Sequence, residues 1–307
     1  MPGPRNDLTD VAGLSVGCAE DERVRTGVTV ILAEQPAVCA VAVQGGGPGT
    51  RESDVLRAGN LVQTVDAIVL AGGSVYGLAA AEAVVAALGA AGRGFQMRDT
   101  PGVPKSPIVP AAILYDLANG GDKAWGDAPP YRGLGQAALA AAGPGVPLGN
   151  AGAGFGALAG ALKGGQGSAS IRTGDGLTVA ALVCVNAFGS TTMPGGKTFW
   201  AWPYEIGGEF GGLAPQPGAT APPEDWSGTK VAPQPRANTT LAVVATDAAL
   251  AHGDLMRVAQ MATAGLARAI RPVFAPFDGD VVFALSTAQA PAPEPAAFTL
   301  ARIGALA

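Results

Sequence analysis

Histidine is almost missing from this chain, whose 307 residues include only His252. Imidazole supplies many of the nitrogen ligands in protein metal sites and the general base of most serine and cysteine nucleophiles. A single copy disfavours a histidine-based metal site and leaves room for at most one Ser-His or Cys-His pair. The sequence therefore predicts that any catalysis works without imidazole.

Cysteine and long apolar runs are also scarce. The three cysteines, Cys18, Cys39 and Cys184, are odd in number and widely spaced, which is typical of reduced thiols in a cytoplasm. The first ten residues lack the apolar core of a secretory signal. The longest uncharged stretches, 134–162 and 176–196, are interrupted by glycine, proline, asparagine or threonine, so neither predicts a membrane span. We expect a cytoplasmic protein.

Positive charge is low: 19 lysines and arginines stand against 24 acidic residues, giving a net charge of −5 and an isoelectric point near 4.9. No basic run is present that would neutralise phosphates, which excludes nucleic acid as an expected partner. Hydrophobic residues make up 48% of the chain, enough for a globular core. The length allows one large domain or two ordinary ones.

Short β-branched runs bounded by glycine and proline predict strands, and apolar residues at helical spacing predict helices. The expected strands cover residues 27–33, 38–43, 67–70, 177–185, 240–246 and 280–285. The expected helices cover residues 74–88, with Ser74 as N-cap, 131–142 and 254–270. Strands and helices that interleave in this way indicate an α/β or α+β fold.

One segment resembles the nucleophile elbow G-x-S-x-G, since Gly72-Gly73-Ser74-Val75-Tyr76 lies between an expected strand and an expected helix. Tyr76 occupies the place of the last glycine, and the base would have to be His252. The residues alone favour a helix N-cap at Ser74. Neither a dinucleotide G-x-G-x-x-G motif nor a complete P-loop is present.

Two carboxylates stand two residues apart in Asp278-Gly279-Asp280, just before an expected strand. Asp-Gly is ordinary turn chemistry, so these residues alone favour a solvated turn over a site. A calcium loop is excluded because Val281, Val282 and Phe283 occupy positions where further oxygen ligands are needed.

A hydroxyl residue marks the junction between a proline-rich segment and a strand. Residues 213–237 contain six prolines and no periodicity, which predicts an exposed connector. Asn238 and Thr239 follow directly, before the apolar run of 240–246. Backbone cleavage there would give Thr239 a free amine with a pKa near 8, able to serve as a base beside its own hydroxyl. The residues alone leave an ordinary loop-to-strand boundary open as the alternative.

From Asn238-Thr239-Thr240 outward, the chain resembles the DmpA/NylC-type self-processing amide hydrolases. This family comprises L-aminopeptidase/D-esterases, β-peptidyl aminopeptidases and 6-aminohexanoate (nylon) oligomer hydrolases. The resemblance extends along nearly the whole chain, in eight blocks that keep the family's order. The blocks are 6–17 (NDLTDVAGLSVG), 26–32 (TGVTVIL), 67–77 (AIVLAGGSVYG), 109–117 (VPAAILYDL), 148–163 (LGNAGAGFGALAGALK), 183–189 (VCVNAFG), 238–247 (NTTLAVVATD) and 277–283 (FDGDVVF). Their order shifts the interpretation of Thr239 towards a nucleophile.

The resemblance implies an α+β fold, a four-layer αββα sandwich similar to the N-terminal nucleophile hydrolases, with residues 1–307 in one domain. It also implies autocleavage between Asn238 and Thr239. The resulting chains, 1–238 and 239–307, stay associated, and the family usually assembles such αβ units into tetramers. No metal or organic cofactor is implied.

The resemblance also assigns site residues, one for each element of a covalent amide hydrolysis. They are Thr239 as nucleophile, Asn186 for the oxyanion, Lys163 as the lysine of the nylon-hydrolase branch, Tyr115 lining the pocket, and Asp278 and Asp280 as the carboxylate pair behind the nucleophile. The carboxylates would orient the Thr239 ammonium, and Lys163 would balance their charge.

This chain departs from the aminopeptidase branch, which typically has a serine nucleophile and a Ser-x-Glu pair. Thr239 with Asp278 and Asp280 is closer to the nylon-hydrolase branch, although the segment after Lys163 is shorter than in that branch. We expect hydrolysis of linear amides: short peptides, amino-acid amides or 6-aminohexanoate oligomers. The alternatives are an acyltransferase of the ornithine acetyltransferase type and a non-catalytic, uncleaved scaffold.

Overall fold

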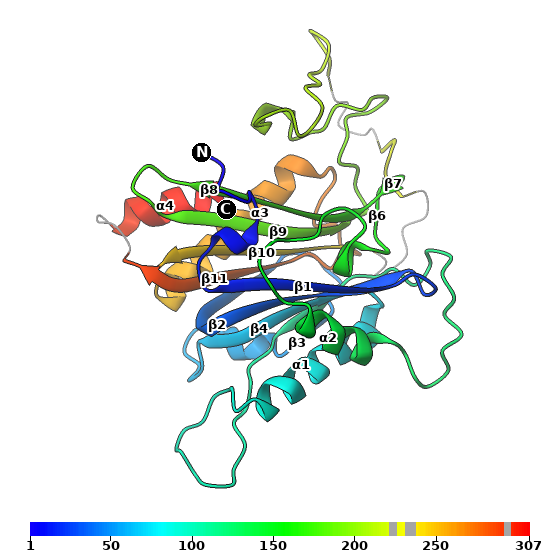
Figure 1. Cartoon of the computed structure of the whole chain (residues 1–307). Helices are drawn as coiled ribbons and strands as arrows, with labels where there is room; N and C mark the ends of the chain where they lie inside the picture. The colour runs from blue at the N-terminus through cyan, green and yellow to red at the C-terminus, as the bar shows by residue number, and fades with distance from the viewer. Residues whose placement is uncertain (221–225, 231–237, 292–295) are drawn as a thin grey trace.

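The computed structural model describes residues 1–220, 226–230, 238–291 and 296–307. Two layers of β-strands lie face to face, with α1 and α2 on one outer face and α3 and α4 on the other (Figure 1). The helices are α1 (Ala79–Ala90), α2 (Tyr131–Ala140), α3 (His252–Ala269) and α4 (Ala296–Leu306). The strands are β1 (Leu14–Asp21), β2 (Thr26–Val43), β3 (Thr50–Arg51), β4 (Thr64–Ala71), β5 (Ala111–Ile113), β6 (Leu158–Ala159), β7 (Leu162–Lys163), β8 (Gly165–Arg172), β9 (Thr178–Asn186), β10 (Thr239–Ala248) and β11 (Val281–Ala290).

Strand β2 joins the two layers. Its first half pairs with β1 and β4, and its second half pairs with β11. The strand order is therefore β3-β5-β4-β2 in one layer and β2-β11-β10-β9-β8 in the other, with β1 beside β2. Strands β10 and β11 are parallel neighbours in the middle of the second layer. The chain that follows residue 238 thus forms the centre of that layer.

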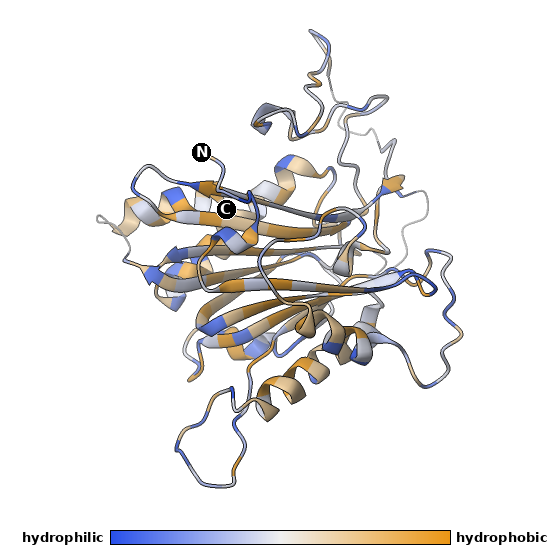
Figure 2. Ribbon diagram, viewed as in Figure 1, coloured by the Kyte–Doolittle hydropathy of each residue, from blue (hydrophilic) through white to orange (hydrophobic). Residues whose placement is uncertain are grey.

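Alternating apolar side chains fill three cores, as expected where each face of a strand is covered. In β10, Leu241 and Val243 face the core between the two layers of strands. Ala242 and Val244 face the core beneath α3 and α4. A third core lies between the first layer and α1 and α2. Hydrophobic colour follows the strands and α1 in Figure 2, and the three cores confirm the predicted four-layer α+β sandwich.

Two local expectations need correction. The predicted strands at 27–33 and 38–43 form one continuous strand, with a register shift against β4 between Leu32 and Ala37. This irregularity leaves Pro36 outside the pairing with β4, so its missing N–H costs no ladder bond there. Ser74 is not an N-cap: it has φ +53° and begins a 3₁₀ turn (Ser74–Leu78) that precedes α1.

The predicted connector at 213–237 lies partly outside the described residues. Residues 213–220 are mostly exposed, as expected. Within 226–230, however, Thr229 is buried and Lys230 is half-buried. This part of the segment is therefore packed against the body, contrary to the prediction from its composition.

None of the helices formed by the described residues combines the length and the apolarity that crossing a membrane requires.

Candidate functional site

Strand pairing brings four predicted site residues together at the start of β10. Thr239 begins β10, and the antiparallel register sets it opposite Asn186 at the end of β9. On the other side, Asn238 forms a parallel bridge with Asp278, just before β11. All four residues are buried. Neighbouring strands thus bring together groups from residues 186, 238–239 and 278, which lie far apart in the sequence.

The carboxylates of Asp278 and Asp280 are buried, contrary to the solvated turn favoured by their local sequence. Asp280 accepts hydrogen bonds from the N–H groups of Thr240 (2.5 Å) and Phe274 (3.2 Å). Asp278 accepts from those of Phe188 (3.4 Å) and Ala275 (3.1 Å). Each side chain is 1% exposed. Backbone donors from three segments therefore hold the pair beneath the start of β10.

Burial raises the pKa of both carboxyl groups. For Asp280, burial and then the neighbouring charge of Asp278 raise the pKa to about 7. For Asp278, backbone hydrogen bonds and the positive charge of Lys230 oppose the effect of burial. Two carboxyl groups with raised pKa values beside a hydroxyl are typical of a catalytic site.

An Asp280→Asn variant is expected to flatten the pH dependence of the free energy of unfolding. Asp280 has a folded pKa of about 7 and an ordinary value of 3.8. Its contribution to stability is therefore fully present below about pH 4 and is lost as the pH rises through about 7. The amount is on the order of 2–4 kcal/mol. Denaturant unfolding at about pH 4.5 and pH 7.5 measures it, with the exposed Asp127→Asn as control. Equal pH slopes in Asp280→Asn and wild type would contradict the assignment.

Gly45, Gly46 and Gly47 pack against the backbone of the segment that holds Asp278 and Asp280. The Gly47 N–H donates to the Asp278 carbonyl (2.7 Å). A Cβ on Gly45 would lie 2.3 Å from the Asp278 carbonyl oxygen, and one on Gly46 would lie 2.3 Å from that of Pro276. Only glycine allows this approach of backbone to backbone. The run of three glycines is the local sequence signal of this close packing.

The side chain of Asn186 is held from both ends. Its Oδ1 accepts from the Leu158 N–H (3.0 Å), and its Nδ2 donates to the Tyr115 carbonyl (2.9 Å). Tyr115 thus contacts the site residue Asn186 through its backbone. Because both ends of the amide are bonded, the direction in which its N–H groups point is fixed.

Lys163 is linked to the Asn186 amide through Leu158. Leu158 pairs with Lys163 in the β6–β7 hairpin and donates its N–H to Asn186 Oδ1. The Lys163 Nζ donates to the carbonyls of Ala157 (3.0 Å) and Gly164 (3.1 Å). Burial lowers its pKa, and the charge that opposes this effect is that of Asp116. Lys163 lines a cavity of about 440 Å³ together with Glu22, Arg25, Asn119, Asn150, Phe155, Gly156 and Leu158.

Lys230 is a site residue that the sequence analysis missed. Its Nζ donates to the backbone carbonyl of Asn186 (3.1 Å) and to the Oδ1 of the same residue (3.3 Å). Its charge also acts on Asp278. Lys230 therefore has the place beside the carboxylates that was expected for Lys163. Its position in a proline-rich, polar segment offered no local signal.

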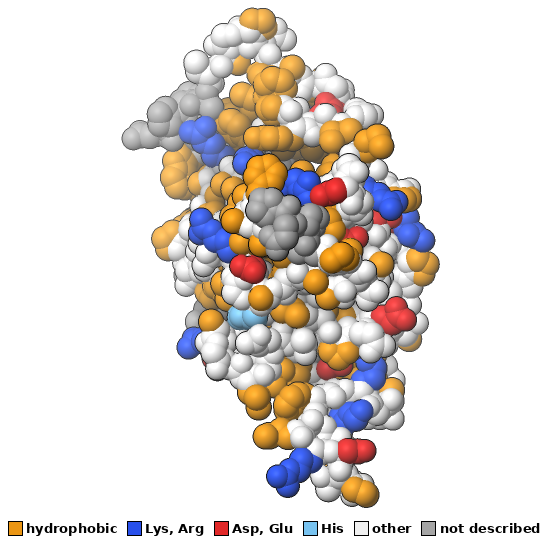
Figure 3. Space-filling view, turned by 90° about the vertical axis from the view of Figure 1, so that its left-hand side faces the viewer, with side chains coloured by type: hydrophobic (Ala, Val, Ile, Leu, Met, Phe, Trp, Pro, Cys, Tyr) orange, Lys and Arg blue, Asp and Glu red, His pale blue; other side chains and the backbone are white. Residues whose placement is uncertain are grey.

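Ser74 and His252 belong to different parts of the molecule. Ser74 donates its N–H to the Leu114 carbonyl, whereas the His252 ring lies 2.9 Å from the Leu56 carbonyl oxygen. His252 lies just after the C-terminal end of β10, whereas Thr239 begins this strand. The length of β10 separates them by about 30 Å. The histidine is visible in Figure 3, which views the left-hand side of Figure 1. The structure thus offers no support for a Ser-His pair.

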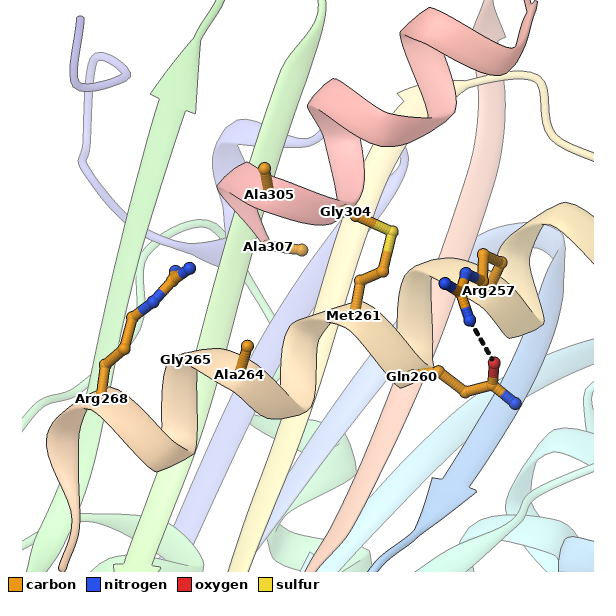
Figure 4. A pocket seen from close by; sticks show the side chains of 9 residues that line it. All are labelled: Arg257, Gln260, Met261, Ala264, Gly265, Arg268, Gly304, Ala305 and Ala307. Atoms are coloured by element: carbon orange, nitrogen blue, oxygen red, sulfur yellow. Dashed lines mark hydrogen bonds between the residues drawn. The ribbon is translucent and has the colours of Figure 1, made fainter.

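A second cavity, of about 300 Å³, lies between α3 and α4 (Figure 4). It is lined by small residues and by Arg257, Gln260, Met261 and Arg268. Arg257 donates to Gln260 within the same helix. None of the described residues that line this cavity has an acidic or nucleophilic side chain, so the cluster around Thr239 is the better candidate site. Among the described residues, no cluster of three or more histidine, cysteine or acidic side chains is arranged to hold a metal ion.

Comparisons with known proteins identify the family of the chain. Residues 6–306 match the sequence profile of Peptidase family S58. An uncharacterised aminopeptidase of Mycobacterium tuberculosis is 43% identical over 296 residues, covering 94% of this chain and 83% of that protein. A 6-aminohexanoate-oligomer endohydrolase of an Agromyces species is 30% identical over 312 residues, covering 93% and 80%.

Solved structures share the fold. A β-aminopeptidase of a Burkholderia species has a TM-score of 0.67 at 27% identity, covering 94% of this chain and 74% of the other. The L-aminopeptidase D-Ala-esterase/amidase of Ochrobactrum anthropi, described as a variant of the Ntn hydrolase fold, has a TM-score of 0.65 at 24% identity, covering 96% and 77%. The chain belongs to Peptidase family S58, the DmpA/NylC family, and is an enzyme that hydrolyses amide bonds.

Proposed function

We propose that this chain is a self-processing amide hydrolase whose nucleophile is Thr239. The observation that carries the proposal is the geometry around the Asn238 carbonyl. Thr239 Oγ1 donates to that carbonyl oxygen (2.5 Å), and the Gly279 N–H donates to the same atom (2.8 Å). A hydroxyl and a backbone donor thus converge on the bond to be cleaved.

Self-cleavage follows from this arrangement in three steps. Thr239 Oγ adds to the Asn238 carbonyl carbon, and the Gly279 N–H stabilises the negative charge that develops on its oxygen. The C–N bond then breaks, and the Thr239 nitrogen takes the proton lost by the hydroxyl, which leaves an ester. One water molecule hydrolyses this ester, so that Asn238 ends in a carboxylate and Thr239 carries a free amine.

The free amine changes what Thr239 can do. With a pKa near 8, it accepts the hydroxyl proton when Oγ attacks a substrate amide. The buried carboxyl groups of Asp278 and Asp280 hold the ammonium form, and the Asn186 amide stabilises the oxyanion. Water then hydrolyses the acyl-threonine ester, and neither a metal nor an organic cofactor takes part.

We assign linear amides with small or unbranched acyl groups as substrates, namely short peptides, amino-acid amides or 6-aminohexanoate oligomers. Similarity to proteins named aminopeptidase and to proteins named 6-aminohexanoate-oligomer endohydrolase supports this range. The cavity beside Lys163 offers about 440 Å³ next to Leu158, which bonds Asn186. Tyr115 does not line this cavity, and we assign it to the substrate site through its backbone carbonyl, which accepts from Asn186 Nδ2.

The experiment that tests this function measures amine release from an amino-acid amide and from 6-aminohexanoate oligomers by purified protein, with Thr239→Ala as blank. We expect release from the amide in the wild type only. No release from oligomers would remove them from the substrate range, and no release from any amide would overturn the proposal. Acylated product in place of free acid, when an amine acceptor is supplied, would favour the acyltransferase alternative.

Assembly and location complete the proposal. Chains 1–238 and 239–307 stay associated because β10 and β11 of the second chain pair with β9 and β2 of the first. We propose tetramers of such pairs. The three cysteines are free thiols, which supports a location in the cytoplasm.

A further inference from the structure

A short turn of the predicted connector is docked onto the site. The Gly228 carbonyl accepts from the Ala161 N–H (2.9 Å), beside the β6–β7 hairpin. The Lys230 N–H donates to the Phe188 carbonyl (3.1 Å), just after β9. The ring of Trp226 packs against that of Phe188, with centroids 5.5 Å apart. We call residues 226–230 the anchor turn, because these bonds tie it to two elements that shape the site.

The anchor turn delivers the Lys230 ammonium to the side-chain amide assigned to the oxyanion. Asn186 Oδ1 accepts from Lys230 Nζ (3.3 Å) and from the Leu158 N–H (3.0 Å). The backbone carbonyl of Asn186 accepts from the same ammonium (3.1 Å). Two donors on Oδ1 require an oxygen at that position, so the Nδ2 end must point the other way.

We propose that Lys230 is a positioning residue of the amide-hydrolase site, which orients the Asn186 amide and supplies the positive charge beside Asp278. This inference rests on the function proposed above. The contacts that hold the anchor turn come from Trp226, Gly228 and Lys230 itself, and none of them involves the bond between 238 and 239. The Lys230–Asn186 contact is therefore retained after self-cleavage and acts in the mature enzyme.

Electrostatics supports the same assignment. Burial lowers the pKa of Lys230 to about 8, and the charge of Asp278 opposes that effect. Three charged groups interact at this site. The charge of Lys230, from the anchor turn, acts on Asp278, and the charge of Asp278 acts on Asp280, both from the segment before β11. Removing the positive charge is expected to raise the pKa of Asp278. An activity that needs this carboxylate ionised would then begin at a higher pH.

The test compares Lys230→Met, Lys230→Gln and Lys230→Arg in the mature enzyme, with exposed Lys197→Met as matched control. We expect Lys230→Met to lower kcat about 10–100-fold through displacement of Asn186, with a smaller change in KM. The acidic limb of the kcat/KM profile is expected to move to higher pH. Lys230→Gln keeps a donor without the charge, so it should shift the limb and retain more of kcat. Lys230→Arg should restore both.

Wild-type kcat and an unmoved pH profile in Lys230→Met would overturn the inference. Circular dichroism establishes that each variant is folded. If Lys230→Met does not fold, the comparison rests on Lys230→Gln and Lys230→Arg, and identical pH profiles in these two would overturn it equally. A wild type that hydrolyses no amide would instead overturn the proposed function, so the two failures are distinguishable.

Discussion

Replacing Thr239 by alanine is expected to leave one uncleaved chain and to lower amide hydrolysis at least about 10³-fold. The side chain removed is the only hydroxyl that contacts the Asn238 carbonyl among the described residues. Without it, neither the attack on Asn238 nor the attack on a substrate has a nucleophile. A denaturing gel measures chain integrity, and amine release from an amino-acid amide measures hydrolysis.

Two further variants make this result specific. Thr239→Ser keeps the hydroxyl and is expected to retain both cleavage and hydrolysis. Thr246→Val removes a buried hydroxyl near the other end of β10 with little change of volume, and is expected to cleave like the wild type. Two chains in Thr239→Ala, or a single chain in Thr246→Val alone, would place the nucleophile elsewhere.

Gly279→Ala is expected to slow self-cleavage about 100-fold. A Cβ at this position would lie 2.7 Å from Thr239 Oγ1 and 2.9 Å from the Gly47 carbonyl oxygen. The second contact is with backbone, which is hard to displace, so the nucleophile and the Gly279 N–H must move apart. A shift of about 1 Å between reacting groups costs on the order of 10² in rate. The rate at which newly purified precursor converts to two chains measures this effect.

Gly167→Ala is the matched control for this prediction. A Cβ on Gly167, in β8, would have no heavy atom within 4 Å. This variant adds the same methyl group to a strand without crowding the site, and it should cleave at the wild-type rate. Wild-type cleavage in Gly279→Ala would show that the donor and the hydroxyl do not act together on Asn238.

The strands that frame the site could be predicted because their signals are local. The expected run at 240–246 corresponds to β10, which begins at Thr239, and the run at 177–185 corresponds to β9. Strand β10 is buried on both faces, and β9 is buried on one face and partly buried on the other. Strands covered on both faces have continuous apolar sequences. Strand β8 was missed because Gly165–Arg172 is rich in glycine and serine, lacks apolar continuity and has Ile171 as its single β-branched residue.

The chemistry of the site depends on contacts that no local pattern contains. Asp278-Gly279-Asp280 has the composition of a surface turn, and it is buried by long-range contacts with the backbone of 45–47 and with the N–H groups of Phe188 and Thr240. Lys230 has the sequence context of an exposed connector, and only its bonds to the end of β9 bring it to Asn186. The family resemblance identified Thr239, Asn186 and the aspartates as candidates, whereas long-range packing reveals Lys230.

Intact mass spectrometry of denatured wild-type protein is the most direct test of the central claim, that Thr239 cleaves its own chain. We expect two chains, residues 1–238 and 239–307, whose summed mass exceeds that of the precursor by one water. The second chain must begin at Thr239 with an unmodified amine. A single full-length mass, or two chains that meet at another bond, would contradict the account.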